Sequence, residues 1–304
     1  MMASVTDSVD DQTRRGGPAA PSLISRRRLL ARRLLRIPRT TERVLGFGIL
    51  GVCLSAFIVV PYVSQDPSSL NALPQQPPSG RNWFGTDWLG RDIFARVFDA
   101  GRLDLLITLV GVSICVLSGV LIGLIAATSH RYVRAVIVWL TDAFLAVPFV
   151  VIVIALVNVI GQTNVLPFLA PSVDALLLAI VLVGWAPYAR LALAQALAMR
   201  EREHVVAARL LGYGRLRILL RHIAPGVMGT NMSYGASQAV STIGLIASLA
   251  FLGAGVREPT PDLGAMMQGG VELLPVAWWI TIIPGLFVLV LGVGFALVAD
   301  SGRR

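Results

Sequence analysis

The sequence contains no lysine, because all 26 of its basic residues are arginine. This absence excludes a Walker A lysine, a lysine Schiff base and a lysine general base. The three histidines, His130, His204 and His222, show no metal-ligand spacing, and neither an H-E-x-x-H motif nor a nucleophile elbow occurs. The sequence therefore offers no catalytic or metal-binding constellation, and we expect the chain to bind no cofactor or metal of its own.

Charged residues are also scarce. They make up 14% of the 304 residues, against about 25% in a typical soluble domain. Hydrophobic residues reach 55%, and the mean hydropathy is +0.73. The two cysteines, Cys53 and Cys115, lie within apolar runs, which favours buried thiols over a disulfide. This composition argues against a soluble enzyme, a disordered chain and a nucleic-acid-binding protein, and it predicts an all-α integral membrane protein.

Six apolar runs are long enough to cross a membrane as helices. They cover residues 44–63, 105–128, 135–160, 175–197, 233–255 and 276–299. They divide the chain into an arginine-rich segment (1–43), a six-helix transmembrane domain (44–299) and a short tail (300–304). A G-x-G-x-x-G string begins at Gly46, but it lies inside the first run without a preceding strand. These glycines favour close helix packing over dinucleotide binding.

The arginines are distributed asymmetrically between the connections. With the N-terminus in the cytoplasm, 21 arginines lie inside and five outside. This asymmetry is typical of the positive-inside rule, and it predicts that both termini are cytoplasmic. Membrane lipid is then a partner of the chain, and nucleic acid is not.

Two connections are too long to be simple turns. The external loop 64–104 holds prolines, then exposed aromatics beside paired charges, which suits a recognition surface. Alternatively, residues 93–103 form an amphipathic helix on the outer membrane interface. The internal loop 198–222 predicts two short helices broken at Gly212, with Pro225 starting the next element. Its small apolar residues Val206, Ala207 and Ala208 either dock into a groove on another protein or belong to a solvated hairpin.

Polar residues inside the runs are the remaining candidates. Asp142 can form a structural pair, contact a substrate or serve a gate, and Arg190 is expected to extend toward the inner interface. Ser233, Ser237 and Ser241 recur one helical turn apart. They either allow close packing or line a translocation path.

Several separated motifs resemble a known family. The internal loop is similar to the E-A-A-x(3)-G-x(9)-I-x-L-P loop of bacterial ABC-importer permeases, with Val206 in place of the glutamate and Ala224 in place of the leucine. Over nearly its whole length the chain resembles the C-type permeases of the dipeptide, oligopeptide and nickel group. The matching positions are Gly85, Thr86, Asp87, Gly90, Arg91 and Asp92 in the external loop, Glu203, Ala207, Ala208, Gly212 and Pro225 in the internal loop, Asp142 with Pro148, and the segments 251–255 and 259–266.

The resemblance implies a type I ABC-importer permease fold of the MetI-like kind and a transport subunit without an ATPase site. It implies a heterodimer with a paralogous B-type permease, two ATP-binding cassette subunits that use ATP and magnesium, and an extracytoplasmic substrate-binding protein. The location would be the bacterial cytoplasmic membrane, and the internal loop would couple the ATPases to transport. The resemblance favours peptides as cargo, with nickel or another small solute as alternatives. A self-contained secondary transporter is a weaker alternative, because it would carry more ionisable residues or inverted repeats.

Overall fold

The computed structural model describes residues 39–302 except 65, 71, 161–170, 254 and 257, so most of the arginine-rich segment and the last two residues lie outside the described residues. The contacts given below lie within the compact unit Glu42–Arg304. All regular elements of the described residues are helical. They are α2 (Arg39–Val63), α3 (Ile93–Thr128), α4 (Arg131–Ala146), α5 (Phe149–Ile160), α6 (Pro171–Met199), α7 (Glu203–Leu210), α8 (Arg215–Ile218), η1 (Leu219–Ile223), α9 (Ala224–Phe251), α10 (Leu263–Gly270), η2 (Val271–Leu273) and α11 (Trp279–Gly302).

In the described part of the chain, five helices are long and apolar enough to cross a membrane, and the number is six if a bent pair of helices is counted as one span. The bent pair is α4 with α5, which meet at an angle of 86°. The third span is therefore broken, where the sequence predicted one run. Pro148 explains the break, because a proline lacks the amide that a helix needs and keeps Val147 in an extended conformation.

Helix α3 joins two segments that the sequence analysis separated. Its 36 residues include both the second span and the segment 93–103, for which a helix on the membrane interface was one of two alternatives. The apolar residues Ile93, Val97 and Ala100 of this segment are fully buried against the protein, so they are not available to face lipid. At 1.5 Å per residue, α3 is about 54 Å long, so it extends well beyond a hydrocarbon core of about 30 Å.

Glycines allow α3 to pack closely along α6. A Cβ added at Gly119 would lie 2.5 Å from the Tyr188 Cβ, and one at Gly123 would lie 2.6 Å from the Ala189 carbonyl oxygen. The two glycines are one turn apart, as in the G-x-x-x-G contacts of membrane helices. Of the glycines predicted to pack in α2, Gly46 approaches α11, whereas Gly48 and Gly51 have no neighbour within 4 Å.

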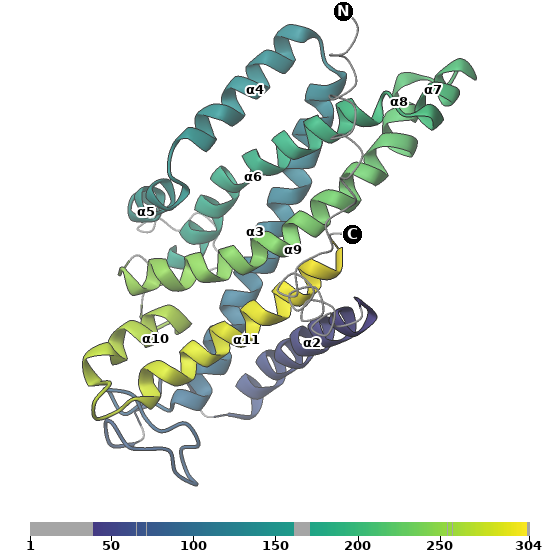
Figure 1. The fold of residues 1–304 in the computed structure, drawn as a ribbon. Coiled ribbons are helices and arrows are strands. Elements are labelled where there is room, and N and C mark those ends of the chain that lie inside the picture. Colours follow the sequence, from purple (N-terminus) through teal and green to yellow (C-terminus); the bar gives the residue numbers. More distant parts are fainter. Residues whose placement is uncertain are drawn as a thin grey trace, which may run out of the picture. The chain divides into compact units, whose positions relative to one another are not determined.

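Helices α9 and α11 lie side by side, and α10 packs against both at one end (Figure 1). The short helices α7 and α8 lie at the other end, where α6 finishes and α9 begins (Figure 1). Both cysteines are free thiols; Cys115 is buried, as expected, and Cys53 is half-buried. The fold therefore places the two long connections of the sequence at opposite ends of α9.

Candidate functional site

The connection between α2 and α3, which was expected to lie outside the membrane, folds tightly around the motif Gly85–Asp92. Gly90 has a φ of +84°, and a Cβ there would lie 2.2 Å from the Ala72 carbonyl oxygen, so glycine is required. The Thr86 hydroxyl donates to the Leu73 carbonyl at 2.8 Å and accepts from the Gln76 amide at 2.8 Å. These bonds hold the proline-rich segment against the motif.

A cluster of ion pairs holds this connection together. The Arg91 Nε donates to Asp87 Oδ2 at 2.6 Å, and its two terminal nitrogens reach the Glu258 carboxylate at 2.9 and 3.1 Å. Arg96 stands 3.8 Å from Asp87 and 3.6 Å from Glu258. The side chains of Asp87, Arg91 and Arg96 are at most 6% exposed, whereas that of Glu258 is 52% exposed. The hydrogen bond from Arg91 lowers the pKa of Glu258 below its usual value.

The folded connection links the N-terminal ends of the two long helices α3 and α11. Asp92 caps α3 by accepting from the Ala95 amide at 3.2 Å, and Trp279, the first residue of α11, donates to the Thr86 carbonyl at 3.3 Å. The paired charges expected on a recognition surface are therefore mostly internal. Trp83 and Trp88 remain 66% and 47% exposed, so a recognition role for these aromatics stays a prediction.

The α7–α8 hairpin contains the two short helices expected from the sequence. Gly212, with a φ of +80°, reverses the chain between them. Beyond α8 the helix widens into the π-turn η1 before α9 begins at Ala224. Pro225 accounts for this widening, because it has no amide to donate to the preceding turn.

The two faces of α7 differ in burial. Val205 and Ala208 are 0% and 4% exposed and pack inward, three residues apart. Glu203, Val206 and Ala207 are exposed, as is Leu210 at 84%. Ala208 was expected on a docking surface, and this expectation is corrected: the hairpin buries it, so the apolar part of the outward surface consists of Val206, Ala207 and Leu210.

Asp142 and Arg190 form an ion pair between α4 and α6. The Arg190 guanidinium donates to Asp142 Oδ1 at 2.8 Å. This contact is the structural pair that was one of the alternatives for Asp142. The two side chains are 48% and 63% exposed within this chain. An exposed ion pair in hydrocarbon is costly, so this face of the bundle suits protein or water.

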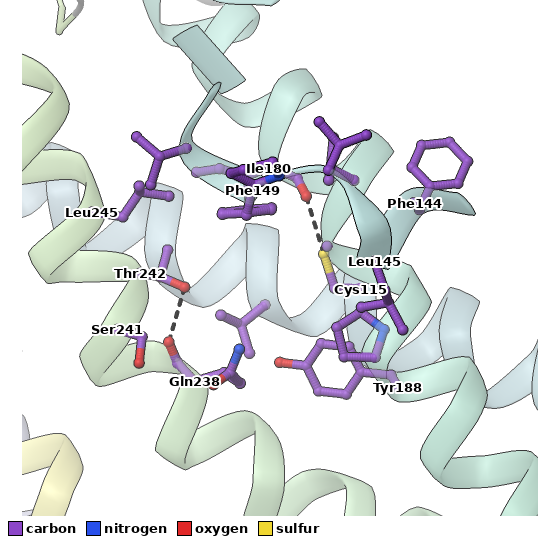
Figure 2. Close-up of a pocket in the computed structure, with 17 residues that line it drawn as sticks. Cys115, Phe144, Leu145, Phe149, Ile180, Tyr188, Gln238, Ser241, Thr242 and Leu245 are labelled. Atoms are coloured by element: carbon purple, nitrogen blue, oxygen red, sulfur yellow. Dashed lines mark hydrogen bonds between the residues drawn. The ribbon is translucent and has the colours of Figure 1, made fainter. Parts of the chain in front are cut away.

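A cavity of about 440 Å³ lies between α3, the α4–α5 bend, α6 and α9 (Figure 2). Most of its wall is apolar, and its polar groups are Tyr188, Gln238, Ser241 and Thr242. The Tyr188 hydroxyl points toward Gln238, and the Thr242 hydroxyl donates to the Gln238 carbonyl at 2.9 Å (Figure 2). An apolar chamber with a few polar groups on one side suits an amphipathic ligand of modest size.

The cavity includes one of the three serines singled out from the sequence. Ser241 lines it, whereas Ser233 and Ser237 do not. The Ser233 hydroxyl donates to the Gly229 carbonyl of its own helix at 3.2 Å. Another face of α9 packs closely against α3, because a Cβ added at Gly235 would lie 2.9 Å from the Val116 side chain.

Sequence reasoning missed the cavity residues Tyr188, Gln238 and Thr242. The available signal was the recurrence of Gln238 and Thr242 one turn apart within an apolar span. That signal shows a polar face on α9, but it does not show which helices enclose it.

Comparison with known proteins now identifies the family. Residues 119–301 match the family described as "binding-protein-dependent transport system inner membrane component". The chain belongs to this family. It is a membrane permease component of ABC transporters, as the resemblance implied. The broken third span and the α7–α8 hairpin are thus features of a permease.

Curated relatives align in sequence with most of this permease. It is 33% identical to the di/tripeptide transport system permease protein DppC of Pseudomonas aeruginosa over 84% of this chain and 85% of the relative. It is 32% identical to the probable D,D-dipeptide transport system permease protein DdpC of Escherichia coli, over 84% and 83%. It is 30% identical to the oligopeptide transport system permease protein OppC of Bacillus subtilis, over 89% and 86%.

Proposed function

We propose that this chain is the C-type permease subunit of an ATP-driven peptide importer. The similarity to permeases named for dipeptide and oligopeptide transport carries the proposal, because it extends over 84–89% of the chain. The cavity beside α9 supports it, since its apolar wall and polar edge suit a short peptide. The permease domain would be residues 44–299, flanked by cytoplasmic segments 1–43 and 300–304.

The partners follow from this role. A paralogous B-type permease would complete the pathway, two ATP-binding cassette subunits would use ATP and magnesium, and an extracytoplasmic protein would deliver the peptide. The exposed Asp142–Arg190 pair supports a second permease or a water-filled pathway beside α4 and α6. The arginine asymmetry supports a bacterial cytoplasmic membrane location with both termini inside, which places the α7–α8 hairpin in the cytoplasm.

The experiment that tests this function is reconstitution. The permease pair, the ATPase subunits and the binding protein are placed in liposomes, and uptake of a labelled dipeptide is followed with and without ATP. The proposal expects uptake only with ATP and with the binding protein. Uptake without ATP would instead indicate a self-contained transporter, and ATP-driven uptake of a non-peptide solute alone would refute the peptide assignment.

The outward face of α7 is the proposed contact for an ATPase subunit. The side chains of Val206, Ala207 and Leu210 are exposed on it. Ala207→Arg should weaken ATPase binding by about tenfold or more, because a large charged side chain would enter an apolar groove. Ala207→Ser, which keeps the small size, is the matched control. Ala208 is unsuitable for this test, because its burial would make a substitution destabilise the permease itself.

The readout is peptide-stimulated ATP hydrolysis together with copurification of the ATPase. Equal stimulation in Ala207→Arg and Ala207→Ser would refute docking through this face.

The external motif residues have a separate proposed role, which is to hold the external loop in a fixed shape beneath the binding protein. These residues are Gly85, Thr86, Asp87, Gly90, Arg91 and Asp92.

A further inference from the structure

A second cavity, of about 550 Å³, lies where α3 and α6 end beside the α7–α8 hairpin. Four elements line it, and its apolar lining is Ile218 of α8 with Leu219 and Ile223 of η1. The polar side chains around it are Thr128, Arg200, Glu201, Arg209, Tyr213 and Arg215. None of these groups has a role in the peptide cavity or in the outward face of α7.

The charge of this cavity is unbalanced. It contains three arginines and one glutamate, and none of the three arginines takes part in a salt bridge in the described part of the chain. Arg200 is fixed in place, because its terminal nitrogen donates to the Ala127 carbonyl at 2.7 Å, at the end of α3. Arg209 and Arg215 enter from the two arms of the hairpin. The cavity therefore gathers guanidinium groups from three elements without a carboxylate for each.

Guanidinium groups arranged in this way fit a phosphate. Arginine donates two parallel hydrogen bonds to phosphate oxygens, and such charge-assisted bonds are stronger than neutral ones. The cavity lies at the ends of α3 and α6, two helices long and apolar enough to cross a membrane, so lipid head groups would be within its reach. Leu216 and Leu220 directly follow the lining residues Arg215 and Leu219 in the sequence. They are one turn apart and 67% and 60% exposed, so they offer an apolar surface on the same helical segment.

We propose that this cavity binds the phosphate of an anionic phospholipid, with its acyl chains along the exposed leucines of α8 and η1. Basic pockets between membrane helices at the cytoplasmic side are suited to such head groups. The site is independent of the peptide substrate, because it shares no residue with the cavity of Figure 2. It is also distinct from the α7 docking face, since Val206, Ala207 and Leu210 do not line it.

The test measures lipid binding to the purified importer complex. The complex is placed in phosphatidylcholine nanodiscs with increasing phosphatidylglycerol, and the tightly bound phosphatidylglycerol is counted by native mass spectrometry. Arg209→Gln with Arg215→Gln should lower the phosphatidylglycerol affinity by at least about tenfold. Arg202→Gln with Arg221→Gln is the control, because it removes the same charge from the same loop outside the cavity.

A second variant keeps the proposal testable if the double variant folds poorly. Glu201→Gln removes the one negative side chain of the cavity, so phosphatidylglycerol binding should tighten by several fold. Equal affinity losses in the cavity and control double variants, or unchanged binding in Glu201→Gln, would overturn the proposal.

Two further arms separate the possible sources of the anion. Inorganic phosphate that binds the wild-type complex at the arginines while phosphatidylglycerol does not would identify a soluble-anion site and overturn the lipid assignment. Loss of the bound lipid when the ATPase subunits associate would identify an ATPase side chain as the occupant, which would also overturn it. A failure of peptide uptake in reconstitution would leave this result unaffected.

Discussion

Replacing Arg91 tests whether the ion cluster holds the external loop together. In Arg91→Gln, the buried Asp87 loses its closest charged partner at 2.6 Å, and Glu258 loses two hydrogen bonds. Breaking a buried pair costs about 3–5 kcal/mol. Asp87 keeps the amide hydrogen bonds from Leu89 and residue 91, at 2.8 and 2.9 Å, and Glu258 is half exposed, so the lower end of that range applies. We expect a loss of about 3 kcal/mol.

The assay is thermal unfolding of the purified permease complex in detergent. A loss of about 3 kcal/mol corresponds to a Tm decrease of roughly 5 °C for a chain of this size, at about 2.1 cal/mol/K of unfolding entropy per residue. Arg81→Gln is the matched control, because Arg81 is exposed on the same loop and lies outside the cluster. It should change stability by less than about 0.5 kcal/mol. Equal Tm values for the two variants would refute the conclusion that the ion cluster stabilises this loop.

Three further predictions concern packing, pH and topology. Gly123→Ala should destabilise the permease by about 1–3 kcal/mol, because its Cβ would meet backbone of α6 at 2.6 Å, whereas Gly292→Ala, with no neighbour within 4 Å, should be near neutral in the same unfolding assay. The hydrogen bond from its arginine partner lowers the pKa of Glu258 below 4.5, so its contribution to stability is present above pH 4.5 and is lost as the pH falls through the lowered pKa. The Tm difference between wild type and Glu258→Gln should therefore shrink on acidification, and a difference that grows would contradict this reasoning. In a cysteine-free background, a cysteine at Ser79 should be labelled from outside intact cells and one at Tyr213 should not, and the reverse pattern would exclude the proposed orientation.

The sequence was sufficient for the features that depend on neighbouring residues. Hydropathy placed the spans, because each apolar run is itself the segment that enters the membrane. The reversal at Gly212 was predictable for a similar reason, since glycine accepts the positive φ that ends α7. The family motifs were recognisable because they are short and contiguous.

Features that depend on distant residues could not be predicted in this way. Arg91 and Glu258 are 167 residues apart in the sequence, so nothing near Arg91 indicates its partner. The burial of Ala208 was missed because the small apolar residues Val206, Ala207 and Ala208 are adjacent in the sequence, and composition does not say which of them packs inward. The bend before α5 had a local signal in Pro148, but a proline inside a membrane span is often tolerated without a break.

One continuous helical segment joins the α7–α8 hairpin, the proposed ATPase contact, to the cavity beside α9, the proposed peptide site. Residues Arg215–Phe251 form a single span of 37 residues, which runs from the hairpin through the π-turn into α9. Gln238 and Thr242, on the polar edge of the cavity, lie on this same segment. At 1.5 Å per residue, Arg215 and Gln238 are about 35 Å apart along it, with no flexible linker between them. A displacement of the hairpin must therefore move α9 or be absorbed at the π-turn, because that turn and Pro225 are where the regular hydrogen bonding of the segment is interrupted.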